Sequence, residues 1–132
     1  MEKNEALKNP RVIIVQKLYS NYVNSDSEIT FPKHRYKKFI KDTVSGTIER
    51  EEVILEKLKE ILKGEFNPSR TDLILKLMIL SATFELMFVH KTPINVIVSE
   101  YVKISDFFLE TAHKGYLNAI LDKVSKNVRK AE

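Results

Sequence analysis

Apolar residues recur every three or four positions along most of the chain, which is the spacing of one face of an α-helix. Between residues 10 and 23, for example, Ile14, Leu18 and Tyr22 are each four positions apart, so their side chains share one face that is expected to turn inward. Residues 94–108 and 112–129 show the same spacing. Because no segment alternates apolar and polar residues as a half-buried strand does, the pattern predicts an all-α protein.

The prolines mark expected helix starts. A proline suits the first helical position, where its missing N–H would have no partner. All four prolines stand where a helix can begin: Pro10, Pro32, Pro68 and Pro93. Asn9, Asn67 and Thr92 precede three of them as candidate N-caps, and Thr111 is a candidate cap for the last helix.

The middle of the chain contains the two longest helical patterns. Residues 32–62 form a helical tract that Ser45 and Gly46 can bend or interrupt, and Gly64 is expected to end it. Residues 69–89 are apolar nearly all round, which predicts a central helix.

The central segment is an unsuitable membrane span. A span needs about 20 consecutive apolar residues, and Lys76 and Glu85 interrupt this segment. The first ten residues are charged and lack the apolar run of a secretory signal. We therefore expect a cytoplasmic protein with no membrane association.

Length and composition fit a single domain. A chain of 132 residues can bury its own core, and the absence of cysteine excludes disulfides and thiolate metal sites. The net charge of +4 is unevenly distributed, because the first 41 residues contain nine Lys or Arg and only four Asp or Glu. A second basic group lies on the last helix, at Lys123, Lys126, Arg129 and Lys130. The basic character of the chain therefore sits at its N-terminal end and on its last helix.

The sequence offers little for catalysis. His34, His90 and His113 are scattered and lack metal-ligand spacing, and three isolated glycines cannot build a phosphate-binding loop. We expect neither an enzyme nor a cofactor or metal. Glu85 and Glu100 lie within apolar helices, where we favour a structural role in helix packing over an acid-base role.

Two groups of residues are candidates for RNA binding. Lys3, Lys8 and Arg11 lie before and within the first turn of the first long helix, where flexible cations can contact phosphates. A solvated helix face explains the same charges equally well. Tyr116, close to Lys114, is either an exposed ring that stacks on an unpaired base or a ring that packs into the core.

Four segments of the chain form a recognisable pattern. They are Val-Gln-Lys-Leu-Tyr-Ser at 15–20, an aromatic and apolar run ending in glycine at 39–46, Ala-Thr-Phe-Glu-Leu at 82–86, and Tyr-Leu-Asn-Ala-Ile-Leu-Asp at 116–122. A proline at 93 and the Ser-Glu pair at 99–100 complete the pattern. The pattern resembles the family of the bacterial transcription antitermination factor NusB. The likeness spans residues 11–124 and looks closest to alphaproteobacterial members.

The resemblance implies two packed helical bundles in one compact domain over residues 1–132. Residues 1–9 are expected to form a basic arm that can be flexible. The implied function is a non-enzymatic RNA-binding transcription antitermination factor. It pairs with NusE, which is also a small-subunit ribosomal protein, and binds boxA RNA in the RNA polymerase antitermination complex, which supports ribosomal RNA transcription. Alone, it is expected to be a monomer or a weak homodimer.

The resemblance also implies site residues. The expected RNA-binding residues are Lys3, Lys8, Arg11, Gln16, Lys114 and Tyr116. The expected partner-binding residues are Tyr19, which matches an interface tyrosine, and Asp72, the acid nearest to a partner-facing position that here reads Leu75. The family's N-terminal arginines are fewer here, so a helical adaptor with reduced or lost RNA affinity is the alternative.

Overall fold

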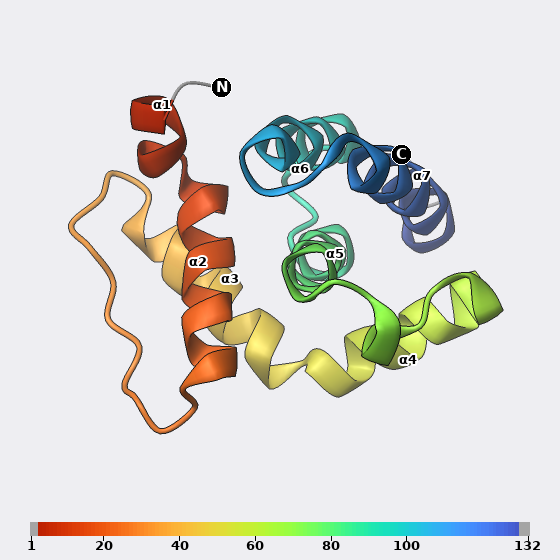
Figure 1. Cartoon of the computed structure of the whole chain (residues 1–132), viewed down its shortest axis with the longest axis horizontal. Coiled ribbons are helices and arrows are strands. Elements are labelled where there is room, and N and C mark those ends of the chain that lie inside the picture. Colours follow the sequence, from red (N-terminus) through yellow and green to blue (C-terminus); the bar gives the residue numbers. More distant parts are fainter. Residues whose placement is uncertain (1–2, 130–132) are drawn as a thin grey trace.

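The computed structural model describes residues 3–129, and within them it contains only helices and their connections (Figure 1). The α-helices are α1 (Lys3–Lys8), α2 (Pro10–Val23), α3 (Lys37–Glu49), α4 (Glu51–Leu62), α5 (Leu73–Phe88), α6 (Ile94–Phe108) and α7 (Thr111–Val128). Two short 3-10 helices, η1 (Lys63–Glu65) and η2 (Pro68–Arg70), connect α4 to α5. The all-α prediction is confirmed.

Helix α5 occupies the centre of the molecule (Figure 1). It packs against α2 and α3 on one side and against α4, α6 and α7 on the other, so it joins two helical bundles. Every residue from Leu77 to Leu86 is buried. A helix that is apolar on all sides has no face suited to water, which explains the central position that the sequence predicts.

Two helices, α2 and α6, have the bounds that the sequence predicts. Helix α2 begins at Pro10 and ends at Val23 as predicted, and Asn9 Oδ1 accepts a hydrogen bond from the backbone N–H of Arg11 at 2.9 Å. Helix α6 also has its predicted bounds, although Pro93 precedes it without a side-chain cap. Residues 3–8, expected to be an arm, form α1, whose Ala6 is buried.

The predicted tract over residues 32–62 is wrong at its start and at its break. Pro32 lies in a loop, α3 begins at Lys37, and the break falls at Arg50 between α3 and α4. Gly46 lies inside α3, where a Cβ atom would stand 2.3 Å from the Phe84 ring. This glycine therefore permits close approach of α3 to α5 instead of interrupting the helix.

The connection from α4 to α5 also differs from the prediction. The residue with positive φ after α4 is Lys63, at 52°, and not Gly64. Asn67 and Pro68 begin η2, and α5 begins later, at Leu73, because Asp72 is the N-cap whose side chain accepts from the Leu75 N–H at 3.1 Å. At α7, Thr111 is the first helical residue and not the cap.

Arg129 closes the C-terminal end of α5. Its side chain is 7% exposed and donates to the carbonyl oxygens of Leu86 at 2.7 Å, Glu85 at 3.0 Å and Val89 at 2.7 Å, and also to that of Thr92. The last carbonyls of a helix have no partner within the helix. A buried guanidinium that carries five donors satisfies several of them at once.

Candidate nucleic-acid interface

A series of exposed cations follows the 24–36 loop into α3. Lys33, Arg35, Lys37 and Lys41 are exposed and make no ion pair within residues 3–129, and the exposed Lys8 at the end of α1 has none either. We call these five residues the basic surface. Lys37 and Lys41 are one helical turn apart on α3 and therefore share a face.

A histidine joins the two parts of the basic surface. His34 Nδ1 accepts a hydrogen bond from the Tyr36 N–H at 2.9 Å, which places the ring proton on Nε2. Nε2 then donates to the Lys8 carbonyl oxygen at 2.7 Å. The loop is thereby held against the end of α1, and Lys8 comes close to cations that follow it by more than two dozen positions in the sequence.

Arg11 lies within the first turn of α2, as the sequence predicts, but its side chain is not exposed to solvent. Its side chain is buried and forms two hydrogen bonds with Glu85, from Nε to Oε2 at 3.1 Å and from Nη2 to Oε1 at 2.6 Å. Its Cζ atom stands 5.0 Å from the centre of the Phe39 ring. Because the carboxylate of α5 balances its charge, we leave Arg11 out of the RNA-contacting set and assign it a structural role.

The Arg11 and Glu85 pair includes a third residue from α6. Tyr101 is fully buried, and its hydroxyl donates to Glu85 Oε2 at 2.5 Å. Burial raises the pKa of Tyr101 well above its ordinary value and the charge of Glu85 raises it further, so the hydroxyl stays protonated. Burial acts to lower the pKa of Arg11, but the hydrogen bonds and charge of Glu85 outweigh it and the net shift is upward. This network agrees with the structural role favoured for Glu85.

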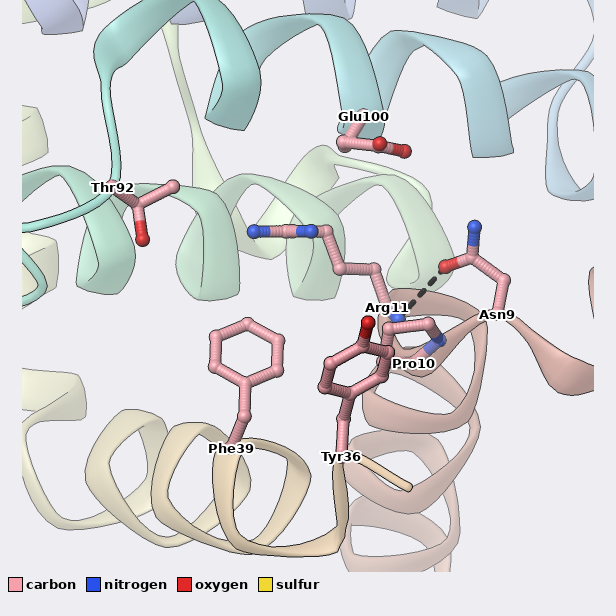
Figure 2. Close-up of a pocket in the computed structure, with 7 residues that line it drawn as sticks. All are labelled: Asn9, Pro10, Arg11, Tyr36, Phe39, Thr92 and Glu100. Atoms are coloured by element: carbon pink, nitrogen blue, oxygen red, sulfur yellow. Dashed lines mark hydrogen bonds between the residues drawn. The ribbon is translucent and has the colours of Figure 1, made fainter. Parts of the chain in front are cut away.

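An open pocket of about 350 Å³ lies beside this network, between α2, α3 and α6 (Figure 2). Figure 2 shows Arg11 extending across it, with Glu100 on the α6 side and the rings of Tyr36 and Phe39 on the α3 side. Its lining residues are Asn9, Pro10, Arg11, Tyr36, Phe39, Thr92 and Glu100. Tyr36 is 47% exposed, and Arg35 Cζ lies 5.4 Å from its ring centre.

Lys8 and Gln16 are exposed as an RNA contact requires. Gln16 lies on α2, but within residues 3–129 no hydrogen bond joins its side chain to the basic surface. Lys3 begins α1, and its side chain lies outside the described residues. Of the predicted N-terminal residues, the structure therefore brings Lys8 into the basic surface.

Lys114 and Tyr116 both have partners within the chain. Lys114 forms an ion pair with Asp106, whose pKa is lowered by this hydrogen bond and charge. The Tyr116 ring is partly buried against the core, and its hydroxyl donates to the Glu65 carbonyl oxygen at 2.9 Å. Burial, together with the charge of Glu65, raises the pKa of Tyr116. This position favours the core-packing alternative, and base stacking by Tyr116 stays a prediction.

The predicted partner-binding residues lie on α2 and at the start of α5. Tyr19 is 41% exposed on α2. Tyr22, one turn later, is 57% exposed, so the prediction that its side chain turns inward with Ile14 and Leu18 is wrong. Lys76 Nζ stands 5.6 Å from the centre of the Tyr22 ring, so the end of α2 meets the first turns of α5 there. Asp72 is exposed, but its carboxylate caps α5.

Four cations of the basic surface were not among the predicted RNA-binding residues. Lys33, Arg35, Lys37 and Lys41 contribute most of the N-terminal charge excess, so the charge count contained the signal, but the residues were assigned to a helical tract that starts at Pro32. Residues 3–129 contain no group of three or more His, Cys, Asp or Glu that is able to hold a metal ion. Within the same residues, no helix is long and apolar enough to cross a membrane.

The arrangement of helices matches a solved structure. T. maritima NusB superposes with a TM-score of 0.80 over 92% of this chain and 92% of that chain, at 20% sequence identity. Identity at this level shows the fold alone. Fold and surface together define an all-α protein with two bundles around a central helix and a basic face formed by α1, the 24–36 loop and α3.

Sequence comparison identifies the family. The model of the NusB family matches residues 4–126, so the chain belongs to the NusB family. Among its relatives, the "Transcription antitermination protein NusB" of Mesorhizobium japonicum is 35% identical over 65% of this chain, and that of Rhodopseudomonas palustris strain BisB18 is 33% identical over 71%. Each match spans 56% of the relative's own length. The family resemblance seen in the sequence is confirmed.

Proposed function

We propose that this protein is a non-enzymatic, RNA-binding transcription antitermination factor. In this proposal it pairs with NusE and binds boxA RNA in the RNA polymerase antitermination complex, in support of ribosomal RNA transcription. Family membership supports antitermination, since the relatives are named for it. The observation that carries RNA binding is the basic surface, whose cations have no ion-pair partner within residues 3–129.

The basic surface suits the backbone of a single strand. Each phosphate that a cation neutralises releases condensed counterions, which makes the logarithm of the binding constant fall by about 0.7 per contact with the logarithm of salt concentration. Five cations supply few such contacts, so we expect NusE to contribute further cations and the two proteins to bind RNA cooperatively.

The α2 surface around Tyr19 and Tyr22 supports the pairing with NusE. Exposed tyrosines are frequent at the centres of protein interfaces because each ring covers a large apolar area and its hydroxyl still reaches a polar partner. Both rings are exposed and lie outside the buried core, so they are accessible to a partner.

The test is a titration of boxA RNA at several salt concentrations, with and without NusE. The variant Lys37→Gln/Lys41→Gln removes two unpaired lysines from one helix face. This variant should reduce the slope of the logarithm of the binding constant against the logarithm of salt concentration by roughly one to two units. The matched control is Lys123→Gln/Lys126→Gln, which removes two lysines from one helix that already pair with Glu65 and Asp122. The control should leave the slope nearly unchanged.

The adaptor alternative has its own support and its own outcome. Arg11, Lys114 and Tyr116 are all occupied by partners within the chain, which reduces the set of residues available to RNA. If NusE binds tightly while boxA RNA binds no better than a scrambled strand of equal length, the protein is an adaptor. If the parent and the Lys37→Gln/Lys41→Gln variant show the same salt dependence of binding, the basic surface does not contact RNA.

A further inference from the structure

The pocket between α2, α3 and α6 has a negative centre. Glu85 balances the charge of Arg11 on the pocket floor. Glu100 also faces this guanidinium and helps to raise its pKa, yet its carboxylate makes no hydrogen bond or ion pair within residues 3–129. Glu100 is partly buried, and neither of its carboxylate oxygens accepts a hydrogen bond within the described residues. A ligand that brings N–H groups to this carboxylate would satisfy it.

Three cations are sequence neighbours of residues that line the same pocket. Lys8 precedes Asn9, and Arg35 and Lys37 flank Tyr36, while Asn9 and Tyr36 themselves line the pocket. All three cations are exposed and make no ion pair within the described residues, and Arg35 Cζ lies 5.4 Å from the Tyr36 ring centre. A cationic peptide from a protein partner would meet repulsion from these cations, whereas a nucleic-acid backbone would be attracted.

The wall of the pocket contains an exposed aromatic ring, which already has the Arg35 guanidinium as a neighbour. Tyr36 is 47% exposed, and it stands on the α3 side of the pocket opposite Glu100 (Figure 2). Unpaired bases stack on such rings in proteins that bind single-stranded RNA, where their Watson–Crick edges are read by side chains. The volume of about 350 Å³ accommodates one base.

These three properties together describe a nucleotide with phosphates near these cations, a flat base against the ring and donors toward the centre. Guanine is the base whose Watson–Crick edge presents two adjacent donors, N1–H and the N2 amino group, which match the two oxygens of a carboxylate. Asn9 Oδ1 is used to cap α2, which leaves its amide N–H groups for the neighbouring O6 acceptor of guanine.

We propose that this pocket binds one unpaired guanine of single-stranded RNA, with Glu100 accepting from N1–H and the N2 amino group and Tyr36 stacking on the base. The inference rests on the proposed RNA-binding function, and it adds a base-specific contact to a surface that otherwise recognises phosphates. Glu100 is then a specificity-determining residue, while the basic surface supplies most of the affinity.

The experiment measures the affinity of the full chain, in the presence of NusE, for short oligouridylates that differ at one central position. This position carries guanine, inosine, adenine or uracil. Inosine differs from guanosine only by loss of the N2 amino group. Losing one hydrogen bond to a charged acceptor should weaken binding about tenfold, so the guanine strand should bind more tightly than the other three.

Variants place the preference in the pocket. Glu100→Gln should reduce the ratio of guanine to inosine affinity to near one without weakening the uracil strand, and Glu52→Gln, an exposed acid on α4, should leave the ratio unchanged. Tyr36→Ala should weaken the guanine strand by about tenfold and Tyr36→Phe should restore it. Tyr36 is exposed, so its two variants should fold. They therefore test the pocket even if Glu100→Gln does not fold.

Each outcome has a separate meaning. If the parent binds every strand with the same salt-dependent affinity, RNA binding stands and the guanine pocket is overturned. If no strand binds, the proposed function fails and the pocket proposal with it. If free guanosine monophosphate binds more tightly than the guanine strand, the ligand is a nucleotide and not RNA. If Glu100→Gln weakens NusE binding and no base preference exists, the pocket is a protein contact.

Discussion

The two basic regions of this protein use their cations differently. On the basic surface, Lys37 and Lys41 stand exposed without an ion pair within the described residues. On and near α7, Lys114 pairs with Asp106 and Lys123 pairs with Glu65 at 2.8 Å. Further along the same helix, Lys126 pairs with Asp122 at 3.0 Å, and Arg129 is buried against backbone carbonyls.

This difference shows that local charge density is an incomplete guide to a nucleic-acid interface. A cation that already has a carboxylate partner must give up this interaction before it neutralises a phosphate, so it contributes less to binding. A cation without a carboxylate partner loses only the conformational entropy of its own side chain when it binds a phosphate. The region near α1 and α3 is therefore the better candidate, although both regions look basic in the sequence.

The largest expected effect concerns the buried cation next to the basic surface. Arg11→Met leaves the Glu85 carboxylate buried without its charge partner, and loss of one member of a buried pair typically costs about 3–5 kcal/mol of unfolding free energy. Urea unfolding measures this difference. Lys41→Met, on the exposed face of the same region, is the control and should change stability by less than about 0.5 kcal/mol. Equal effects for the two variants contradict the division between structural and ligand-facing cations.

The next effect separates an exposed tyrosine from a packed one. Tyr19→Ala should weaken NusE binding by about 2 kcal/mol, because a central interface tyrosine loses its whole contact area on truncation. Its stability should change little, since the ring is 41% exposed. Calorimetry with NusE and thermal unfolding of the free protein measure both quantities. Unchanged affinity for NusE would remove Tyr19 from the interface. A variant that unfolds would assign the Tyr19 ring to the core.

A smaller effect is expected at the α7 end. Tyr116→Phe removes the hydrogen bond to the Glu65 carbonyl and should lower stability by about 1 kcal/mol. Affinity for boxA RNA in the presence of NusE should stay the same, because the ring packs against the core. Tyr116→Ala should destabilise further. A loss of RNA affinity in Tyr116→Ala with unchanged stability indicates base stacking and extends the RNA site to α7.

The smallest effect concerns the titration of Asp106. The hydrogen bond and charge of Lys114 lower the pKa of this carboxyl from its usual value of 3.8. A lowered pKa in the folded state gives a contribution to stability that is present above pH 3.8 and is lost as pH falls through the lowered value. NMR titration should show this low pKa in the parent and a normal one in Lys114→Gln. An identical pKa in both proteins means that the ion pair does not persist in solution, which weakens the contrast between the two regions.

The sequence predicted the parts of the fold that depend on near neighbours. Apolar spacing and a cap located α2 from Pro10 to Val23, and spacing located α6 from Ile94 to Phe108. Helical periodicity and capping involve residues within four positions of one another, so they can be read directly. Local reasoning predicted a helix break at Gly46, which was wrong. This glycine leaves room for the ring of Phe84, which lies on a helix nearly forty positions away in the sequence.

Residue order alone was enough to establish that this protein is helical, that its charge excess lies in the first 41 residues and that it resembles the NusB family. Which cations remain available to a ligand depends on the folded arrangement of the helices. Arg11 and Glu85 are 74 positions apart, and Lys123 and Glu65 are 58 apart, so no local pattern reveals their pairing. Burial and ion pairing depend on which segments meet when the chain folds, and these contacts separate the structural cations from those that face solvent.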